Sequence, residues 1–354
     1  MASLTVKQIG IWKNSFILWN YVIEKEPAGS IIPHINLGLA FEGKGLKDQA
    51  IEQYKIALTL DPGDAVGHNN LGVVYDEKDL IDQAIEQYQI ALRLDPNYAM
   101  PHNNLGESFK KKGLIDQAIS QYKIALIIDP NSVITRNNLG EAYEKKGLTE
   151  QAIEQYQINI RLNPNYDLAY NKLGTAYEQK GLIDQAIEQY KVAVRLDPKD
   201  ALGHNKLGEA YEKKGLITLA IEQFQIIVRL HPDYALAHNN LGAAYQKKGL
   251  LDQAIEQYKT ALRLNPNDFD AHNNLGAVYL ERGMKEQATE QFRIALTLRP
   301  GSPVAHNNMG GAYGMFGLID QAVEQFEIAV KLDPANPDFR RNLNRASEKK
   351  KLNR

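Results

Sequence analysis

The sequence contains no cysteine, no marked excess of charge of either sign and no long apolar run. Without cysteine the chain forms no disulfide, binds no metal through thiolates and performs no thiolate catalysis. The 41 basic and 43 acidic residues give a net charge of -2, so there is no general electrostatic attraction to nucleic acid. The most apolar N-terminal stretch, residues 9–23, contains Lys13, Asn14 and Asn20 and is shorter than the ~20 residues of a membrane span. We therefore expect no nucleic-acid partner and no direct membrane insertion of this chain.

The sequence also lacks the common motifs of catalytic sites. Gly43-Lys44-Gly45 is not followed by the rest of a phosphate-binding loop. There is no His-Glu-x-x-His metal motif and no Gly-x-Ser-x-Gly nucleophile motif. We therefore expect a non-enzymatic protein with no cofactor and no metal.

What the sequence does have is one unit repeated at intervals of 34 residues. Leu-Gly recurs from Leu37-Gly38 onward and ends as Met309-Gly310, while a proline recurs from Pro62 to Pro334. Nine copies of the unit occupy residues 31–336. A fixed period of this length is typical of solenoid proteins, in which each unit buries its apolar face against its neighbours.

Within one unit, Ala65 to Tyr98, the apolar residues follow two helical stripes separated by a turn. The first stripe contains Leu71 and Tyr75; the second contains Ala84, Ile85, Tyr88, Ala91 and Leu92. A glycine stands at the turn in the other copies, but the second copy has Asp79, which adopts a left-handed conformation less readily. Pro96 prevents the second helix from continuing. Each unit is therefore predicted to be helix, turn, helix.

This unit resembles the tetratricopeptide repeat (TPR). The matching positions are His68, Leu71, Gly72, Tyr75, Ala84, Tyr88, Ala91 and Pro96. The resemblance implies an all-α fold, a right-handed superhelical solenoid in which the first helix of each unit lines a concave groove. The array is expected to be one elongated domain. One departure is systematic, because the large first residue is histidine in seven copies, Arg136 in one and Tyr170 in another.

The repeats divide the chain into three parts. Residues 1–30 are interpreted as degenerate N-terminal capping helices, with Ile9, Trp12, Phe16 and Trp19 on one apolar stripe. Residues 31–336 are the nine repeats, and residues 337–354 are a basic C-terminal capping helix. A solvated cap is the first interpretation of that basic helix, and contact with an acidic partner or a membrane surface is the second.

Residues 9–30 carry a second, looser resemblance. Trp12-Lys13-Asn14, Leu18-Trp19 and Pro27 before the first repeat are similar to the junction that precedes the TPR array in TMTC-like membrane glycosyltransferases. That resemblance implies an excised domain, extracytoplasmic and membrane-tethered. Otherwise the expectation is a soluble, cytoplasmic protein.

Asparagine pairs before the leucine are the main candidate for a binding site. Asparagine is unfavourable within a helix by up to ~0.7 kcal/mol relative to alanine, and its amide both donates and accepts hydrogen bonds. The TPR array of O-GlcNAc transferase similarly presents asparagines at the position of Asn70. The amides are therefore predicted to bind the backbone of an extended peptide, or alternatively to bridge adjacent helices. The candidates are Asn69, Asn70, Asn103, Asn104, Asn137, Asn138, Asn171, Asn205, Asn239, Asn240, Asn273 and Asn274.

Charged residues interrupt the asparagine rows in the middle of the chain. Lys172 and Lys206 replace the second asparagine, and Glu141 and Glu209 follow on the same helix face. These side chains are predicted to line the groove and to select a charged ligand, or alternatively to form an ordinary solvated face.

Seven histidines share one column, from His34 to His306. Adjacent helices pack about 8–10 Å apart, whereas two ligands of one zinc ion lie within about 3.5 Å of each other. The histidines are therefore expected to be hydrogen-bonded packing residues rather than metal ligands.

The sequence as a whole favours a scaffold that binds a protein or an extended peptide in its concave groove. Two alternatives stay open: a domain that recruits acceptor protein to a membrane glycosyltransferase, and a self-assembling scaffold, a homo-oligomer formed by end-to-end or lateral packing. A TPR fold alone does not decide among them.

Overall fold

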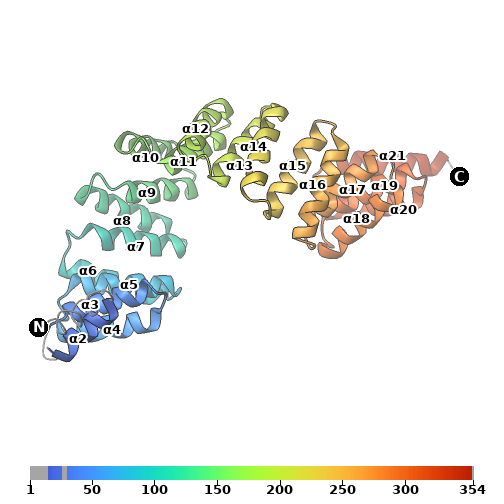
Figure 1. Cartoon of the computed structure of the whole chain (residues 1–354). Coiled ribbons are helices and arrows are strands. Elements are labelled where there is room, and N and C mark those ends of the chain that lie inside the picture. The colour runs from blue at the N-terminus through green and yellow to red at the C-terminus, as the bar shows by residue number, and fades with distance from the viewer. Residues whose placement is uncertain (1–14, 26–29, 353–354) are drawn as a thin grey trace, which may run out of the picture. The chain divides into compact units, whose positions relative to one another are not determined.

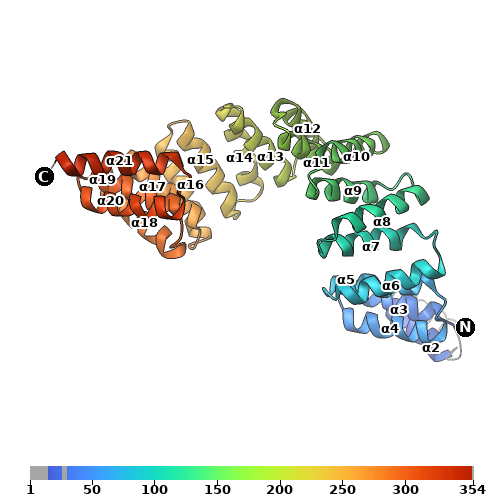
Figure 2. The same ribbon diagram turned by 180° about the vertical axis from the view of Figure 1, so that it is seen from behind.

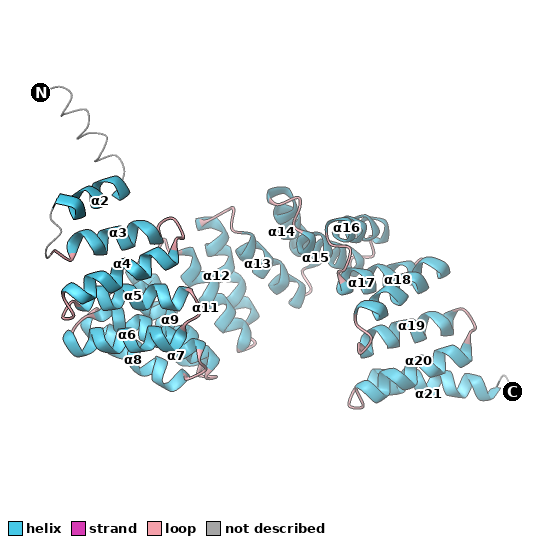
Figure 3. Cartoon of the chain, turned by 90° about the horizontal axis from the view of Figure 1, so that it is seen from below, coloured by secondary structure: helices cyan, strands magenta, loops and turns pink. Residues whose placement is uncertain are grey.

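The computed structural model describes residues 15–25 and 30–352. Over these residues every regular element is a helix, and Figure 3 shows the helices joined by short loops without a strand. The residues group into two compact units, 1–180 and 181–354. No helix in the described ranges is long and apolar enough to cross a membrane. Ile9 and Trp12 of the predicted N-terminal stripe lie outside the described residues.

In the first unit, helices that follow one another in the sequence pack side by side (Figure 1). They are α2 (Ser15–Lys25), α3 (Ile32–Glu42), α4 (Lys47–Leu60), α5 (Ala65–Glu77), α6 (Ile81–Leu94), α7 (Ala99–Lys111), α8 (Ile115–Ile128), α9 (Val133–Lys145), α10 (Thr149–Leu162) and α11 (Asp167–Gln179). The leading helix α2 packs against α3, where the rings of Phe16 and Phe41 meet edge to face with centroids 4.9 Å apart.

The second unit has the same construction, and Figure 2 shows it from the opposite side. Its helices are α12 (Ile183–Leu196), α13 (Ala201–Lys213), α14 (Ile217–Leu230), α15 (Ala235–Lys247), α16 (Leu251–Leu264), α17 (Phe269–Glu281), α18 (Lys285–Leu298), α19 (Pro303–Met315), α20 (Ile319–Leu332) and α21 (Pro337–Leu352). The last helix, α21, packs on α20 and buries Phe339 and Ala346.

The Leu-Gly pair is the tightest point within each repeat. A Cβ atom added to Gly72 would lie 2.6 Å from Cε1 of Tyr88, and one added to Gly106 would lie 2.7 Å from Cε1 of Tyr122. Such distances are far inside van der Waals contact, so only glycine lets the two helices of the pair approach this closely. The ring above the glycine is fully or almost fully buried, as Tyr88 is at 1% exposure.

The turn between the two helices has a left-handed residue, as the sequence predicts. Gly113 has φ 77°, and Asp79 is the non-glycine residue with positive φ in the described chain, at 61°. After the turn, Leu114 N donates to Phe109 O at 2.9 Å, which satisfies a carbonyl at the end of α7.

First helices of successive repeats approach one another along one face of each unit. In the first unit α5 meets α7 and α7 meets α9; in the second unit α15 meets α17, α17 meets α19 and α19 meets α21, each with Cα atoms within 8 Å. These first helices therefore share one surface within each unit. Side chains that recur every 34 residues on these helices form rows across this surface, which we call the first-helix face.

Candidate functional site

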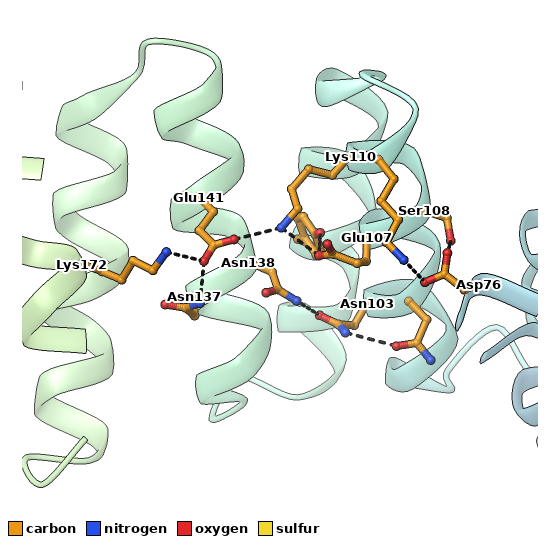
Figure 4. A network of polar contacts seen from close by, with 12 residues as sticks. Asp76, Asn103, Glu107, Ser108, Lys110, Asn137, Asn138, Glu141 and Lys172 are labelled. Atoms are coloured by element: carbon orange, nitrogen blue, oxygen red, sulfur yellow. Dashed lines mark hydrogen bonds and ion pairs between the residues drawn. The ribbon is translucent and has the colours of Figure 1, made fainter. Parts of the chain in front are cut away.

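The predicted asparagines lie on the first-helix face, where they join successive repeats by hydrogen bonds. Nδ2 of the second asparagine in one repeat donates to Oδ1 of the first asparagine in the preceding repeat. In the first unit, Asn104 donates to Asn69 at 3.1 Å. Asn138 donates to Asn103 at 3.1 Å, as Figure 4 shows. In the second unit the bonds are Asn240 to Asn205 at 2.9 Å, Asn274 to Asn239 at 3.3 Å, Asn308 to Asn273 at 3.0 Å and Asn342 to Asn307 at 2.9 Å.

In the first unit, further bonds within each repeat make the row continuous. Nδ2 of Asn69 donates to Oδ1 of Asn70 at 3.4 Å, and Nδ2 of Asn103 donates to Oδ1 of Asn104 at 3.3 Å. Amide bonds thus follow one another from Asn138 to Asn70. Asn69 is only 1% exposed, whereas Asn70, Asn104 and Asn138 are half-buried. These amides therefore bridge adjacent helices, which was one of the two predicted roles. The second asparagine of each pair also keeps an accessible edge with unused hydrogen-bonding capacity.

The asparagine row stops at Lys172 on α11. Among the described residues Oδ1 of Asn137 is buried without a hydrogen-bond partner, at the place where the preceding repeats supply an asparagine donor. Lys172 instead pairs with Glu141 at 2.8 Å, and Nδ2 of Asn137 donates to the same carboxylate at 3.1 Å. Asn171, the first residue of this pair, is 5% exposed.

A charged network runs beside the amides on α7 and α9 and reaches Lys172 on α11, where a lysine takes the place of the second asparagine (Figure 4). Lys110, 7% exposed, pairs with Glu107 at 2.8 Å and with Glu141 at 3.0 Å. Burial disfavours the charge of Lys110, but hydrogen bonds and the charges of both glutamates outweigh it and raise the pKa of Lys110. Burial likewise disfavours the charge of Glu141, but Lys172 and Lys110 outweigh it and lower its pKa. The two lysines and two glutamates neutralise one another, so this part of the face offers little net charge to a ligand.

In the second unit, by contrast, the predicted charged pair lies within one repeat. Lys206 lies 3.3 Å from Glu209, and Nδ2 of Asn205 donates to the same glutamate at 2.6 Å. Lys206 and Glu209 are each about one-third exposed. Because exposed pairs contribute only ~0–1 kcal/mol, a ligand could replace either partner at small cost.

A row of exposed apolar side chains lies beside the asparagines, and the sequence analysis missed it. The row occupies the second position of the first helices, four residues before the second asparagine, which places both rows on one helix face. Its exposure runs from 46% to 66%, which is high for large apolar residues. The members are Val66, Met100, Ile134, Leu202, Leu236 and Val304, with Ile32 of α3 in the same 34-residue register; in that register Leu168 is half-buried and Asp270 interrupts the row. Their recurrence every 34 residues was present in the sequence, but recurrence alone did not distinguish them from core positions.

Similar hollows lie between two pairs of successive members of this apolar row. In the first unit a hollow of about 500 Å³ is lined by Met100, Ile134, Asn103 and Asn104 among others. In the second unit a hollow of about 640 Å³ is lined by Leu202, Leu236, Asn205 and Lys206. Each hollow therefore combines apolar walls with amide or ammonium groups.

Beneath the face, the buried tyrosines of two second helices donate to a polar residue twelve positions earlier, whereas Tyr122 donates to Glu107 at 3.0 Å, fifteen positions earlier. Tyr156 donates to Glu144 at 3.0 Å and Tyr258 donates to Gln246 at 3.1 Å. Burial raises the pKa of Glu144, with a smaller opposing effect from Tyr156. In three repeats phenylalanine takes the place of this tyrosine. The residue twelve positions earlier is then leucine in one repeat, glycine in another and glutamate in the third. Phe292 follows Leu280, Phe326 follows Gly314, and Phe224 follows Glu212.

The histidine column is structural, as predicted. Nε2 of His102 donates to Pro96 O at 3.1 Å, and Nδ1 lies 2.7 Å from Oε1 of Gln121 on the second helix. The exceptions keep part of this pattern, because Arg136 donates to Pro130 O at 2.7 Å and Tyr170 donates to Pro164 O at 3.1 Å. No cluster of three or more histidine, aspartate or glutamate side chains within the described residues could hold a metal ion.

Comparison with known families agrees with this architecture. Models described as "TPR repeat" match residues 80–113, 108–147, 179–215 and 247–283, and models described as "Tetratricopeptide repeat" match residues 33–64, 135–166 and 205–252. Together they cover more than half of the chain. The chain belongs to the tetratricopeptide-repeat family. No curated protein sequence is significantly similar to it.

Solved TPR structures are similar to this chain over different lengths. The Cut9–Hcn1 hetero-tetramer structure of APC/C matches 94% of this chain and 82% of its own at 17% identity, with a TM-score of 0.55. Pseudomonas aeruginosa pilF matches 57% of this chain and 92% of its own at 22% identity, with a TM-score of 0.51. These two likenesses confirm the all-helical TPR solenoid fold. MamA is 33% identical over 46% of this chain and 95% of its own, with a TM-score of 0.43.

Proposed function

We propose that this TPR chain is a protein-interaction scaffold that binds an extended partner segment along its first-helix face. The observation that carries the proposal is the parallel course of two rows on that face, one of exposed apolar side chains and one of half-buried amides. Apolar rows that remain exposed on a folded protein commonly mark interaction sites. Amides beside them can hydrogen-bond a peptide backbone whatever its sequence.

The spacing of the repeats favours an extended ligand. Cα atoms of neighbouring first helices come within 8 Å, and packed helices are about 8–10 Å apart. An extended or polyproline-type chain advances about 3.1–3.4 Å per residue. About every third residue of such a ligand would therefore meet an equivalent hollow, and a ligand with apolar residues at that interval would fill successive hollows.

The apolar row provides a cleaner test than the asparagines do, because replacing an asparagine would also remove a bond between repeats. A peptide library of about twelve residues, enough for four repeats at about three residues each, is screened against the chain and against a variant with four serines. The substitutions are Met100→Ser, Ile134→Ser, Leu202→Ser and Leu236→Ser. These side chains are exposed, so their replacement should leave the helical content unchanged.

A matched control variant places serines at exposed apolar positions on second helices: Leu94→Ser, Ile127→Ser, Leu196→Ser and Leu230→Ser. The proposal expects peptides with apolar residues about three apart, bound by the wild-type and control proteins and lost from the first-helix variant. Peptides that bind the first-helix variant as well as the wild type would refute the assignment of the face. A library without any hit, together with a mass that rises with protein concentration, would favour self-assembly instead.

A further inference from the structure

The first-helix face of the second unit ends in a hollow between α19, α20 and α21, which lie side by side in Figure 3. Its volume is about 380 Å³. It is lined by Gly311, Gly314 and Met315 of α19, Ile319 and Phe326 of α20, and Asn342, Arg345, Ala346 and Lys349 of α21. This hollow lies beyond the last asparagine of the repeats and involves the capping helix.

The wall formed by α19 is open and uncharged. The sequence of α19 from Pro303 to Met315 contains no aspartate, glutamate, lysine or arginine. A Cβ atom added to Gly311 would meet nothing within 4 Å, whereas the same position in earlier repeats carries larger side chains such as Val73 and Glu141. Glycine in a helix interior costs about 1 kcal/mol relative to alanine, so Gly311 leaves room here without helping the helix, whereas a Cβ atom at Gly314 would lie 3.8 Å from Cβ of Ala322.

The opposite wall, on α21, is cationic. The helix carries six basic residues and two acidic ones between Pro337 and Leu352. Some of its cations are already engaged, since Lys350 pairs with Asp320 at 2.7 Å and Arg341 pairs with Asp338 at 3.1 Å. Arg345 and Lys349 are exposed one helical turn apart, and neither has an ion-pair partner among the described residues.

We propose that this hollow binds an acidic partner segment with an apolar side chain between its carboxylates. The apolar side chain enters the space over Gly311 and Gly314 beside Met315, which is 65% exposed. The flanking carboxylates pair with Arg345 and Lys349, and Asn342 lies at the same wall. Charge complementarity selects the partner, and the concave wall favours a peptide over a flat lipid surface. The inference rests on the proposed function in that both use the first-helix face.

The test uses the full chain and a fluorescent nine-residue peptide of glutamates with one central leucine. Two matched probes replace the glutamates by glutamines or the leucine by serine. Fluorescence anisotropy at low salt should show binding of the acidic leucine peptide, and both matched probes should bind more weakly. The double variant Arg345→Gln/Lys349→Gln should weaken binding about tenfold, because each exposed ion pair is worth up to ~1 kcal/mol. Gly311→Leu, which fills the open space, should also weaken it without removing a charge.

Lys351→Gln serves as the control, because Lys351 is an exposed cation of the same helix that does not line the hollow. It should change the affinity less than twofold. Equal losses in Lys351→Gln and in the double variant would overturn the site, since they would indicate nonspecific attraction to a basic helix. Equal affinity for the glutamine peptide would overturn it too. Binding of anionic lipid vesicles that is insensitive to Gly311→Leu, with no binding of the peptide, would assign the helix to membrane surfaces.

The acidic-peptide test and the peptide-library test of the proposed function can fail independently of each other. Library peptides that depend on the apolar row but no affinity for the acidic probe would refute only this inference. Affinity for the acidic probe that depends on Arg345, Lys349 and Gly311, without any library peptide that depends on the apolar row, would refute only the longer groove.

Discussion

Replacing Phe224 by tyrosine should stabilise the second unit, although it adds a polar group to a buried ring. Phe224 is 1% exposed and lies in the column where most repeats have tyrosine. The residue twelve positions earlier, Glu212, has one carboxylate oxygen, Oε1, that is buried without a hydrogen-bond partner among the described residues. Its other oxygen accepts from Lys247 at 2.7 Å. In the repeat of Glu144, the Tyr156 hydroxyl donates to one carboxylate oxygen, Oε2, while Oε1 is likewise buried without a partner among the described residues.

The expected gain follows from the difference between a satisfied and an unsatisfied buried oxygen. A hydrogen bond to a charged group contributes about 1.5–3 kcal/mol, and a buried acceptor left without a donor costs about 1–3 kcal/mol. The Glu212 side chain is 15% exposed and already paired with Lys247, so the lower end applies. We expect Phe224→Tyr to raise the free energy of local opening by about 1–2 kcal/mol.

Phe292→Tyr is the matched control. The residue twelve positions earlier is Leu280, which cannot accept a hydrogen bond from the new hydroxyl group. Phe292 is fully buried, so this substitution should destabilise its repeat by about 1–3 kcal/mol. Hydrogen exchange of the amides of α13–α14 and of α17–α18 reports each region separately, which matters because repeat arrays need not unfold in one step. The reasoning fails if the two substitutions change the exchange free energy in the same direction.

Three further substitutions test other contacts of the face and core. Glu144→Gln should stabilise the chain at neutral pH. Burial raises the pKa of Glu144 from its usual 4.5, so the native state favours the protonated carboxyl group. The stability that the protonated Glu144 contributes is therefore complete at acid pH and is lost as the pH rises through the raised pKa. The advantage of the variant in urea unfolding should therefore grow with pH above about 4.5, and an advantage that does not vary with pH would contradict this. Lys172→Asn should give the buried Oδ1 of Asn137 the donor it lacks and stabilise α9 and α11 by about 0.5–1.5 kcal/mol. Faster hydrogen exchange in α9 would refute this and show that the ion pair with Glu141 contributes more. Gly106→Ala should destabilise its repeat by more than about 2 kcal/mol, because the new methyl group overlaps a buried ring, and an unchanged melting temperature would show that the ring can move aside.

The fold was predictable because each repeat encodes its own constraints. A glycine is needed opposite the ring of Tyr88, a left-handed residue is needed at the turn, and proline ends the second helix. The sequence also predicted that Asp79 takes the left-handed turn position although it is not glycine. Its φ of 61° lies in that left-handed region, which is less favourable for aspartate than for glycine. These are local requirements, and the period of the sequence repeats them in every unit.

The site was predictable only in part, because its chemistry depends on contacts between repeats. The sequence places Asn103 and Asn138 on the same helix face, but the bond that joins them spans 35 residues. The same applies to Lys110, whose burial between Glu107 and Glu141 could not be read from a helix surface pattern. The exposed apolar row could not be predicted because apolar residues such as Ile134 have the same sequence pattern as core residues. Only the packing of the helices shows that they are exposed.

The two roles first considered for the asparagines, binding a peptide and bridging helices, need not compete. An asparagine amide has two donor hydrogens and an oxygen that can accept twice. Asn104 donates once to Asn69 and accepts once from Asn103, so one hydrogen and one acceptor site remain on its half-exposed edge. Because the bond to the preceding repeat fixes the orientation of the amide, the remaining groups are held in place before any ligand arrives, and binding then costs less side-chain entropy. Each asparagine lowers the helix propensity, but asparagines that are linked by hydrogen bonds would form a rigid row of donors and acceptors. A row of solvated amides without such links would not be rigid.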